Sequence, residues 1–195
     1  MLSIRRLLVT FLLSLVAPIS LFAQFPVPTT RQLEDTQPAQ IHELVSKYCR
    51  LDYEGARLDP QAWPKIEPLV SWKSAPDYTK INVVARYKVD MPDASSSHNK
   101  LTVSVHYRLL GTFDIATGYI TEPPGSNQDV AFIVTSDNGD NRIADAENTL
   151  PHPSRAAMLK WLNEKLNAAQ DDATKARYQD AIRQLSAQSA SPFAK

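Results

Sequence analysis

The spacing of apolar residues along the chain changes from a helical period to a strand period and back to a helical one. Between Pro38 and Gly55, apolar residues recur every three or four positions, which predicts an amphipathic helix. Proline suits a first helical turn and glycine suits a stop. Asp59 followed by Pro60 predicts a second, short helix with an aspartate cap. Its buried side would carry Trp63, Ile66, Leu69 and Val70.

Apolar and polar residues then alternate strictly, which predicts half-buried strands over 81–89 and 101–109 with a polar loop between them. In the first strand, the predicted inward positions are Ile81, Val83, Ala85, Tyr87 and Val89. In the second strand they are Leu101, Val103, Val105, Tyr107 and Leu109. Clean alternation favours antiparallel pairing, and Gly111 predicts a bulge or bend. A third strand is expected over 130–135.

The last part of the chain returns to helical spacing. Pro151-His152-Pro153-Ser154 is expected to end the sheet, and a helical pair follows within 151–186. Asp171 or Asp172 would cap the second of these helices. Their inward positions are Met158, Trp161, Leu162 and Leu166, then Tyr178, Ile182 and Leu185. The order of elements predicts one α+β domain over 38–150, the helical pair, and a frayed tail over 187–195.

The N-terminal segment has the pattern of a secretory signal peptide. Arg5 and Arg6 precede an apolar run from Leu7 to Val16, which is too short to span a bilayer as a helix. We expect cleavage near Ala23, so residues 1–23 would be removed and 24–37 would form a flexible linker. The sequence thus predicts a secreted or periplasmic protein without a stable membrane anchor.

The composition of the chain excludes several classes of function. The chain has 195 residues, with 21 lysines and arginines against 21 acidic residues, so it offers no bulk attraction to nucleic acid. It has one cysteine, Cys49, which excludes a disulfide framework and a multi-cysteine metal site. Cys49 lies in the apolar pattern of the first helix, so we expect a buried, inert thiol. No cofactor-binding fingerprint is present, and we expect no cofactor.

The segment from Ser136 to Glu147 approaches a calcium-binding loop. Asn138, Asp140 and Glu147 occupy ligand positions, but Ser136 replaces the first ligand and Asn141 replaces the turn glycine. The flanking residues predict strands rather than helices. A plain hairpin, with a turn over 137–140 and a returning strand over 142–145, is therefore the preferred prediction, with no metal site.

The histidines and serines show no catalytic spacing. His106 lies in the middle of a predicted strand, on the same face as Arg86 and Arg108 and opposite Tyr87 and Tyr107. This face would point outward, so His106 is expected to be a solvated residue or a dimer contact rather than a general base. No nucleophile elbow, phosphate loop or dinucleotide motif accompanies it.

Aromatic residues predict a ligand pocket between the helices and the sheet. Tyr48 and Asp52 lie four residues apart on one helical face, and a buried Asp52 is the weak candidate for a catalytic base. Rings and hydroxyls around one carboxylate are typical of a small-molecule site. The alternative is that these rings are core residues and Asp52 lies at the helix margin. The other predicted pocket residues are Trp63, Trp72, Tyr87 and Tyr107.

Several patterns together resemble those of an exported bacterial member of the nuclear transport factor 2-like superfamily. They are YCRLDYEGARL, WPKIEPLVSW, INVVARYKV, LTVSVHYRLLG and the hairpin ending GDNRIAD, within residues 38–150. The resemblance implies helices packed into a bent antiparallel sheet that forms a cone with an apolar cavity. It also implies kinship with ketosteroid isomerases and polyketide cyclases, in which a cavity Asp or His acts with tyrosines.

Three functions stay open from the sequence. The leading expectation is an exported, non-catalytic domain that binds a small apolar ligand or a protein partner. The second is a cofactor-independent isomerase, dehydratase or cyclase with Asp52 as base. The third is a structural or assembly protein that forms a homodimer through the sheet face bearing Arg86, His106 and Arg108.

Overall fold

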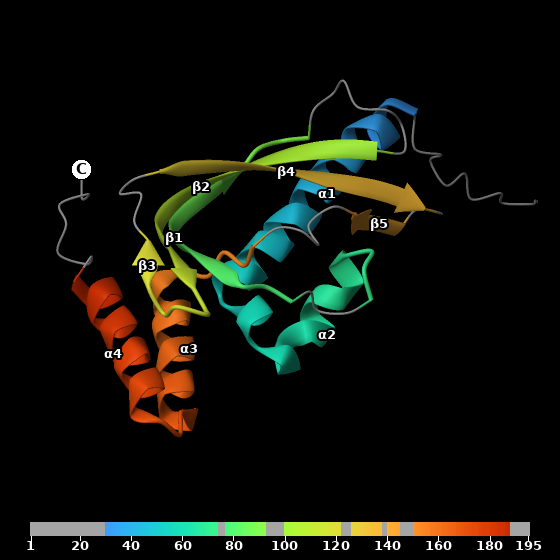
Figure 1. Ribbon diagram of the computed structural model, residues 1–195. Helices are drawn as coiled ribbons and strands as arrows, with labels where there is room; N and C mark the ends of the chain where they lie inside the picture. Colours follow the sequence, from blue (N-terminus) through green and yellow to red (C-terminus); the bar gives the residue numbers. More distant parts are fainter. Residues whose placement is uncertain are drawn as a thin grey trace, which may run out of the picture.

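The structure is a computed structural model, and it describes six parts of the chain. These parts are residues 30–73, 77–92, 100–121, 126–137, 140–144 and 150–187. The predicted signal peptide and the tail from residue 188 lie outside them. The described part is an α+β structure in which helices pack against a curled antiparallel sheet (Figure 1).

Helices flank the strands in chain order. The helices are α1 (Thr30–Tyr53), α2 (Trp63–Ile66), α3 (Arg155–Ala168) and α4 (Asp172–Ala187), with 3-10 turns at Ala56–Leu58, Pro60–Ala62 and Glu67–Leu69. The strands are β1 (Lys80–Val89), β2 (Lys100–Asp114), β3 (Ile120–Thr121), β4 (Asn127–Asp137) and β5 (Asp140–Ile143).

Helix α1 begins at Thr30, before the predicted start at Pro38, so the second half of the predicted linker is helical. Residues 31–34 are Arg, Gln, Leu and Glu, which all favour helix, and the helix continues through Pro38. The helix ends as predicted beside Gly55, whose φ of 91° is the left-handed conformation that glycine adopts without a steric penalty.

The second predicted helix forms as a series of short turns rather than one helix. Asp59 caps the first turn, because its carboxylate accepts a hydrogen bond from the Gln61 backbone N–H at 2.9 Å. Pro64 and Pro68 follow at intervals of four residues. Since proline has no N–H and clashes with the preceding turn, a continuous helix cannot form here.

The sheet is ordered β1-β2-β4-β5, with β3 paired to the end of β2. Tyr87 lies opposite Tyr107, and Tyr107 lies opposite Gln128, so these three residues share the inner face of the sheet. Strands β4 and β5 form the predicted hairpin, with Asp137 opposite Asp140. The strand β3 was not predicted, because two residues are too few to show a period.

Two bulges change which residues of the central strands face inward. Val83 pairs with Gly111 but Val84 pairs with Leu109, which leaves Leu110 as an extra residue on β2. A second irregularity follows on β1 at Ala85. Each extra residue inverts the alternation beyond it. The predicted inward set of β1 is therefore wrong in part, because Ala85 is exposed, whereas Ile81 and Val83 face away from Tyr87.

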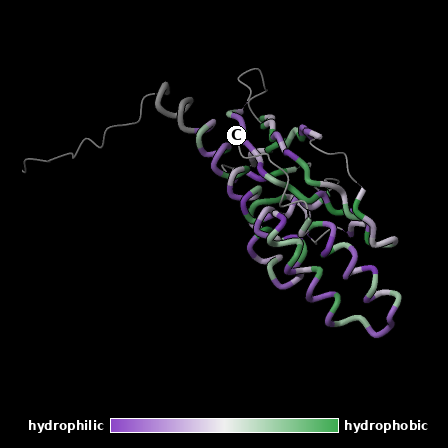
Figure 2. Tube along the Cα trace, turned by 90° about the vertical axis from the view of Figure 1, so that its left-hand side faces the viewer, coloured by the Kyte–Doolittle hydropathy of each residue, from purple (hydrophilic) through white to green (hydrophobic). Residues whose placement is uncertain are grey.

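The inversion gives the protein two hydrophobic cores, one on each face of the sheet. The first core lies between α1 and the inner face and includes Tyr48, Val105 and Phe132. The second core lies between the α3–α4 pair and the opposite face and includes Phe113 and Leu162. Figure 2 shows hydrophobic positions concentrated in the strands, with hydrophilic positions along the outer turns of the helices.

Candidate functional site

A short segment between the sheet and α3, residues 150–154, lies along the outer edge of β1. We call it the strap. The backbone N–H groups of Asn82 and Val84 donate to the carbonyls of Pro151 and Pro153, both at 2.9 Å. On its other side, the Ser154 N–H donates to the Tyr53 carbonyl at 2.8 Å. The strap therefore joins the first half of β1 to the C-terminal end of α1.

The sequence of the strap suits burial because proline has no backbone donor. Pro151, His152 and Pro153 are all buried, so each N–H in this segment needs an acceptor inside the protein. After Leu150, only His152 and Ser154 supply such donors, and the His152 N–H is accepted by Asp52 Oδ2 at 3.0 Å. Alternating prolines thus leave few backbone groups to satisfy.

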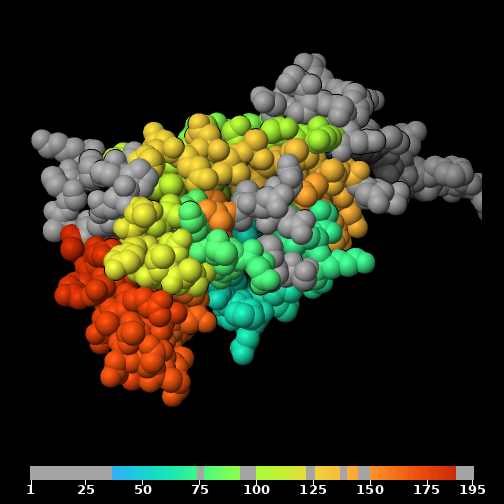
Figure 3. Space-filling view, viewed as in Figure 1, coloured from blue at the N-terminus to red at the C-terminus, as the bar shows by residue number. Residues whose placement is uncertain are grey.

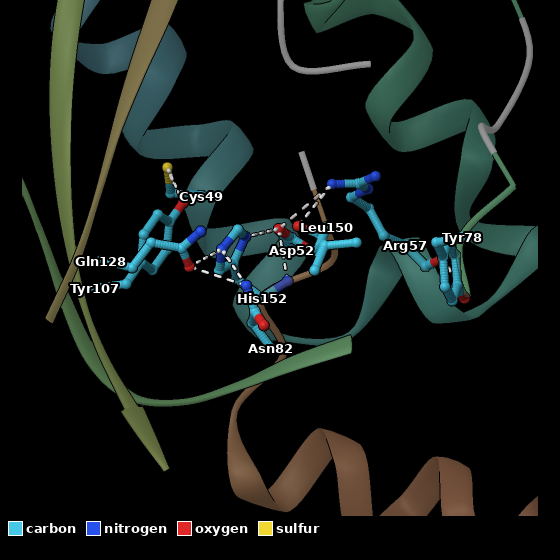
Figure 4. Close-up of polar contacts among 9 residues, drawn as sticks. All are labelled: Cys49, Asp52, Arg57, Tyr78, Asn82, Tyr107, Gln128, Leu150 and His152. Carbon is cyan, nitrogen blue, oxygen red and sulfur yellow. Dashed lines mark hydrogen bonds and ion pairs between the residues drawn. The ribbon is translucent and has the colours of Figure 1, made fainter. Parts of the chain in front are cut away.

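Asp52 lies near the end of α1 and is 1% exposed. Its Oδ2 atom accepts the His152 backbone N–H, lies 3.5 Å from His152 Nδ1 and lies 4.0 Å from Arg57 Nη1. Arg57 also donates to the carbonyl of Leu150, at 3.2 Å. Figure 4 shows these side chains converging from α1, the following turn and the strap. The buried carboxylate therefore has two cationic or ionisable neighbours.

The other side of the His152 ring meets carboxamides from the sheet. His152 Nε2 lies 3.1 Å from Gln128 Oε1, which also accepts from Asn82 Nδ2 at 2.9 Å. Thr112 in turn donates to Asn82 Oδ1 at 2.8 Å. Because Gln128 Oε1 is an acceptor, this arrangement favours a proton on Nε2. The ring then turns Nδ1 toward the Asp52 carboxylate, 3.5 Å from Oδ2.

An aromatic ring forms the floor of the site. Tyr107 stacks on the His152 imidazole, with ring centroids 4.0 Å apart and an interplanar angle of 13°. The Tyr107 hydroxyl lies 3.4 Å from Cys49 Sγ. Burial raises the pKa of the Cys49 thiol to about 12 and raises the pKa of Tyr107 well above its usual value. Cys49 is thus the buried thiol that the sequence predicts, and it stays protonated near neutral pH.

The predicted pocket residues separate into groups. Tyr107 and Asp52 both contact His152, and Tyr87 lies beside Tyr107 with ring centroids 6.1 Å apart. Tyr48 instead packs against Trp72 and Phe132 in the first core. Trp63 lines a separate surface pocket of about 210 Å³ together with Arg57 and Tyr78. All of the predicted pocket residues except Asp52 belong to the first core or pack against it.

Sequence reasoning did not identify His152, Gln128 or Asn82 as site residues. Asn82 was placed on the outward face of its strand, and the bulges of β1 and β2 turn it inward. His152 lies 100 residues from Asp52, so no local spacing connects them. A histidine between two prolines is the one signal that could have indicated a buried, extended segment.

The sheet face opposite α1 carries His106, as predicted. Its Nδ1 lies 2.7 Å from Asp129 Oδ1, its Nε2 lies 2.7 Å from Asp90 Oδ2, and its side chain is 42% exposed. The hydrogen bonds that the imidazole donates to these carboxylates raise the pKa of His106, with the larger effect from Asp129 and the smaller from Asp90. Lys88 also contacts Asp90, which lowers the pKa of that carboxyl.

The described residues include a larger surface groove, between the turns after α1 and helix α3. It has a volume of about 490 Å³ and a floor of small and apolar residues such as Ala157 and Trp161. Lys165 lies over the Trp161 ring, 5.4 Å from its centroid. The groove is open to solvent and separate from the buried site.

Of the calcium candidates, Asp140 lies in the β4–β5 hairpin, whereas Asn138 and Glu147 lie outside the described residues. Within the described part of the chain, no group of three or more histidine, cysteine or acidic residues is arranged to hold a metal ion. Within the same part, no helix combines the length and the apolar character needed to cross a bilayer.

Comparison with family models, with curated proteins and with solved structures gives no match to this chain. The function is therefore argued from the geometry of the site and the surfaces around it.

Replacing Asp52 by Ala should strongly destabilise the protein. The change removes the acceptor of the buried His152 N–H and the carboxylate that lies 4.0 Å from Arg57, a loss of about 3–5 kcal/mol. Urea unfolding measures this cost. The matched control is Asp59→Ala, which removes an exposed cap at a cost of about 1 kcal/mol. Equal destabilisation by both substitutions would contradict the role assigned to Asp52.

The raised pKa of His106 predicts that this residue stabilises the fold most at low pH. Its stabilising contribution is fully present below the pKa of the unfolded chain, about 6.5, and is lost as the pH rises through the higher folded-state pKa. The free energy of unfolding should therefore differ more between the wild type and His106→Gln at pH 6 than at pH 9. A constant difference across this range would show that the two carboxylates do not hold the charged imidazole.

Proposed function

We propose that this chain is an exported, non-catalytic binding domain of the nuclear transport factor 2-like type, and that it recognises a protein partner. The basic start and apolar run of residues 5–16 support export. Helix α1 packed against a curled antiparallel sheet supports the cone-like architecture that the sequence resemblance implies.

The observation that carries the proposal is the position of His152. Its ring occupies the face of Tyr107 that a planar ligand would need, and its Nε2 side meets Gln128, which also bonds to Asn82. Asp52 and His152 are each 1% exposed. A catalytic base must come within hydrogen-bond distance of its substrate, and here the strap lies in that place. Binding at the outer surface fits this geometry better than binding in the interior.

Native mass spectrometry of the mature protein, purified from its own compartment, tests the proposal. We expect the mass of the processed polypeptide, alone or with a second protein, and no small molecule bound. A small apolar ligand that stays bound to the protein would overturn the proposal in favour of an interior ligand site. A protein whose mass includes residues 1–23 would contradict export with cleavage near Ala23.

A cofactor-independent isomerase, dehydratase or cyclase is the second candidate, because Asp52 and His152 place a carboxylate beside an imidazole in a buried site, with Oδ2 3.5 Å from Nδ1. In this alternative the strap must open to admit substrate. Hydrogen bonds from β1 and α1 hold it on both sides, which supports the closed state. A homodimer through the sheet face bearing Arg86, His106 and Arg108 is the third candidate, and the same mass measurement tests it.

The reactivity of His152 separates the closed binding domain from an enzyme. Diethyl pyrocarbonate modifies accessible imidazoles, and peptide mass spectrometry locates the modified residues. We expect His152 to react much more slowly than His106, because the strap buries the first ring and the second is partly exposed. Similar rates for the two histidines would show that the site opens readily, as an enzyme requires.

A further inference from the structure

The outer edge of β1 is covered along its first half only. The strap accepts the N–H groups of Asn82 and Val84 at 2.9 Å, and the Tyr53 hydroxyl donates to the carbonyl of Ala85 at 3.1 Å. In the part of the chain that the structure describes, no strand pairs with this edge and no hydrogen bond reaches it beyond Ala85. We call residues 86–89 the open edge.

The ladder between β1 and β2 decides which backbone groups of the open edge point outward. The Asp90 N–H donates to the Ser104 carbonyl on β2, at 2.9 Å. In an antiparallel pair, every second residue bonds to the neighbouring strand and the residues between them point to the other edge. The register runs unbroken from Val89 back to Arg86. The N–H and C=O groups of Tyr87 and Val89 therefore point outward, away from β2.

The side chains of the open edge differ between the two faces of the sheet. Tyr87 and Val89 are half-buried on the inner face, where they pack against the first core. Arg86 is exposed on the outer face, and within the described residues no hydrogen bond or ion pair engages its side chain. Lys88 is bound to Asp90 at 2.7 Å. A strand added here would therefore meet apolar side chains on one face and an unpaired guanidinium on the other.

Side chains on the outer face of this half of the sheet reach solvent. Ala85, Arg86 and Lys88 are exposed, and Met91, close after the open edge, is 58% exposed. Figure 1 shows α1 on the inner side of the curled sheet, and in Figure 3 the atoms of β2 and β4 reach the surface of the molecule. An accessible strand edge with free donors and acceptors is a template for a further strand.

We propose that the open edge binds an extended segment of a partner protein, which adds a strand to the sheet and places an acidic side chain against Arg86. This inference rests on the proposed function and specifies how the partner binds. In strand addition, main-chain hydrogen bonds supply affinity and alternate side chains supply specificity. Apolar residues of the segment cover Tyr87 and Val89, and a carboxylate on the other face accepts two hydrogen bonds from the guanidinium.

The charges of the open edge favour a different protein over a second copy of this chain. Two copies would pair about a two-fold axis. A register centred on Tyr87 would set Arg86 opposite Lys88 of the second copy, and a register centred on Lys88 would set two lysines opposite each other. Like charges at directly opposed positions destabilise a sheet. A register centred on Val89 would extend beyond the end of β1.

Binding of a fluorescently labelled peptide of alternating valine and glutamate to the mature protein, measured by anisotropy, tests strand addition. The controls are two forms of the peptide, one N-methylated on the valines and one on the glutamates. Only every second amide of a paired strand faces its neighbour. One methylated form should therefore bind at least about tenfold more weakly than the parent peptide, and the other should bind equally well. Equal binding by the two forms would overturn the proposal.

Substitutions in the protein test the backbone contact and the charge separately. Val89→Pro removes an outward N–H, which an edge strand tolerates, and should raise the Kd about tenfold. Val89→Ala keeps this N–H and is the matched control. Arg86→Gln should raise the Kd and weaken its salt dependence, whereas Lys160→Gln removes an exposed charge on α3 and should leave the Kd unchanged. Equal effects within either pair would overturn the proposal.

Amide hydrogen exchange, followed by NMR, tests the open edge without any substitution. In the free protein, the amides of Tyr87 and Val89 should exchange much faster than those of Arg86 and Lys88, which bond to β2. The valine–glutamate peptide should slow exchange at Tyr87 and Val89. Equal protection of all these amides in the free protein would show that the edge is already covered, and would overturn the proposal.

Light scattering tests a second copy as the occupant of the open edge. We expect a monomer, and a dimer that Val89→Pro converts to monomer would overturn the choice of a different protein. A failure of peptide binding would remove this site without changing the ligand or partner mass that native mass spectrometry reports. A retained small apolar ligand would overturn the proposed function without changing exchange at the open edge. The failures of the two proposals are therefore distinguishable.

Discussion

The hydrogen bonds that hold the strap between β1 and α1 are the constraint on which the rest of the structure depends. Through them, the end of α1, the first half of β1 and the start of α3 become neighbours. The Asp52 carboxylate completes this junction by accepting the one N–H of His152. Without it, the buried His152 N–H would lose its acceptor, and the α3–α4 pair would lose its fixed point of attachment.

The bulges in β1 and β2 determine how one sheet serves two cores. A sheet with unbroken alternation would bury one set of residues against α1 and expose the other. The extra residue at Leu110 lets Tyr107 face α1 while Phe113 faces the α3–α4 pair. Gly111 beside it has no side chain, and a Cβ atom there would approach Ile120 to 2.7 Å. Close pairing with β3 therefore requires glycine at this position.

The polar residues of the sheet form two groups, one buried beside the strap and one exposed on the outer face. Inside, Asp52 binds the His152 backbone and Gln128 and Asn82 meet the His152 ring, which fixes the strap. Outside, Arg86 and Arg108 lie at directly opposed positions of β1 and β2, and His106 bonds to Asp90 and Asp129.

The sequence by itself determined the class of fold and the position of most elements. Local periodicity showed the α+β order, the stop at Gly55, the inward face of β2 and the β4–β5 hairpin, because each depends on residues that are neighbours in the chain. It also indicated that Cys49 is buried and that His106 lies on an open face.

Only the tertiary structure decided the composition of the site and the faces of β1. The partners His152 and Asp52 are 100 residues apart, and the bulges that turn Asn82 inward arise from pairing between strands. Neither leaves a period in the sequence, since both depend on contacts between distant segments. For the same reason, the sequence does not show that Arg86 lies directly opposite Arg108. The register of β1 and β2 decides this pairing.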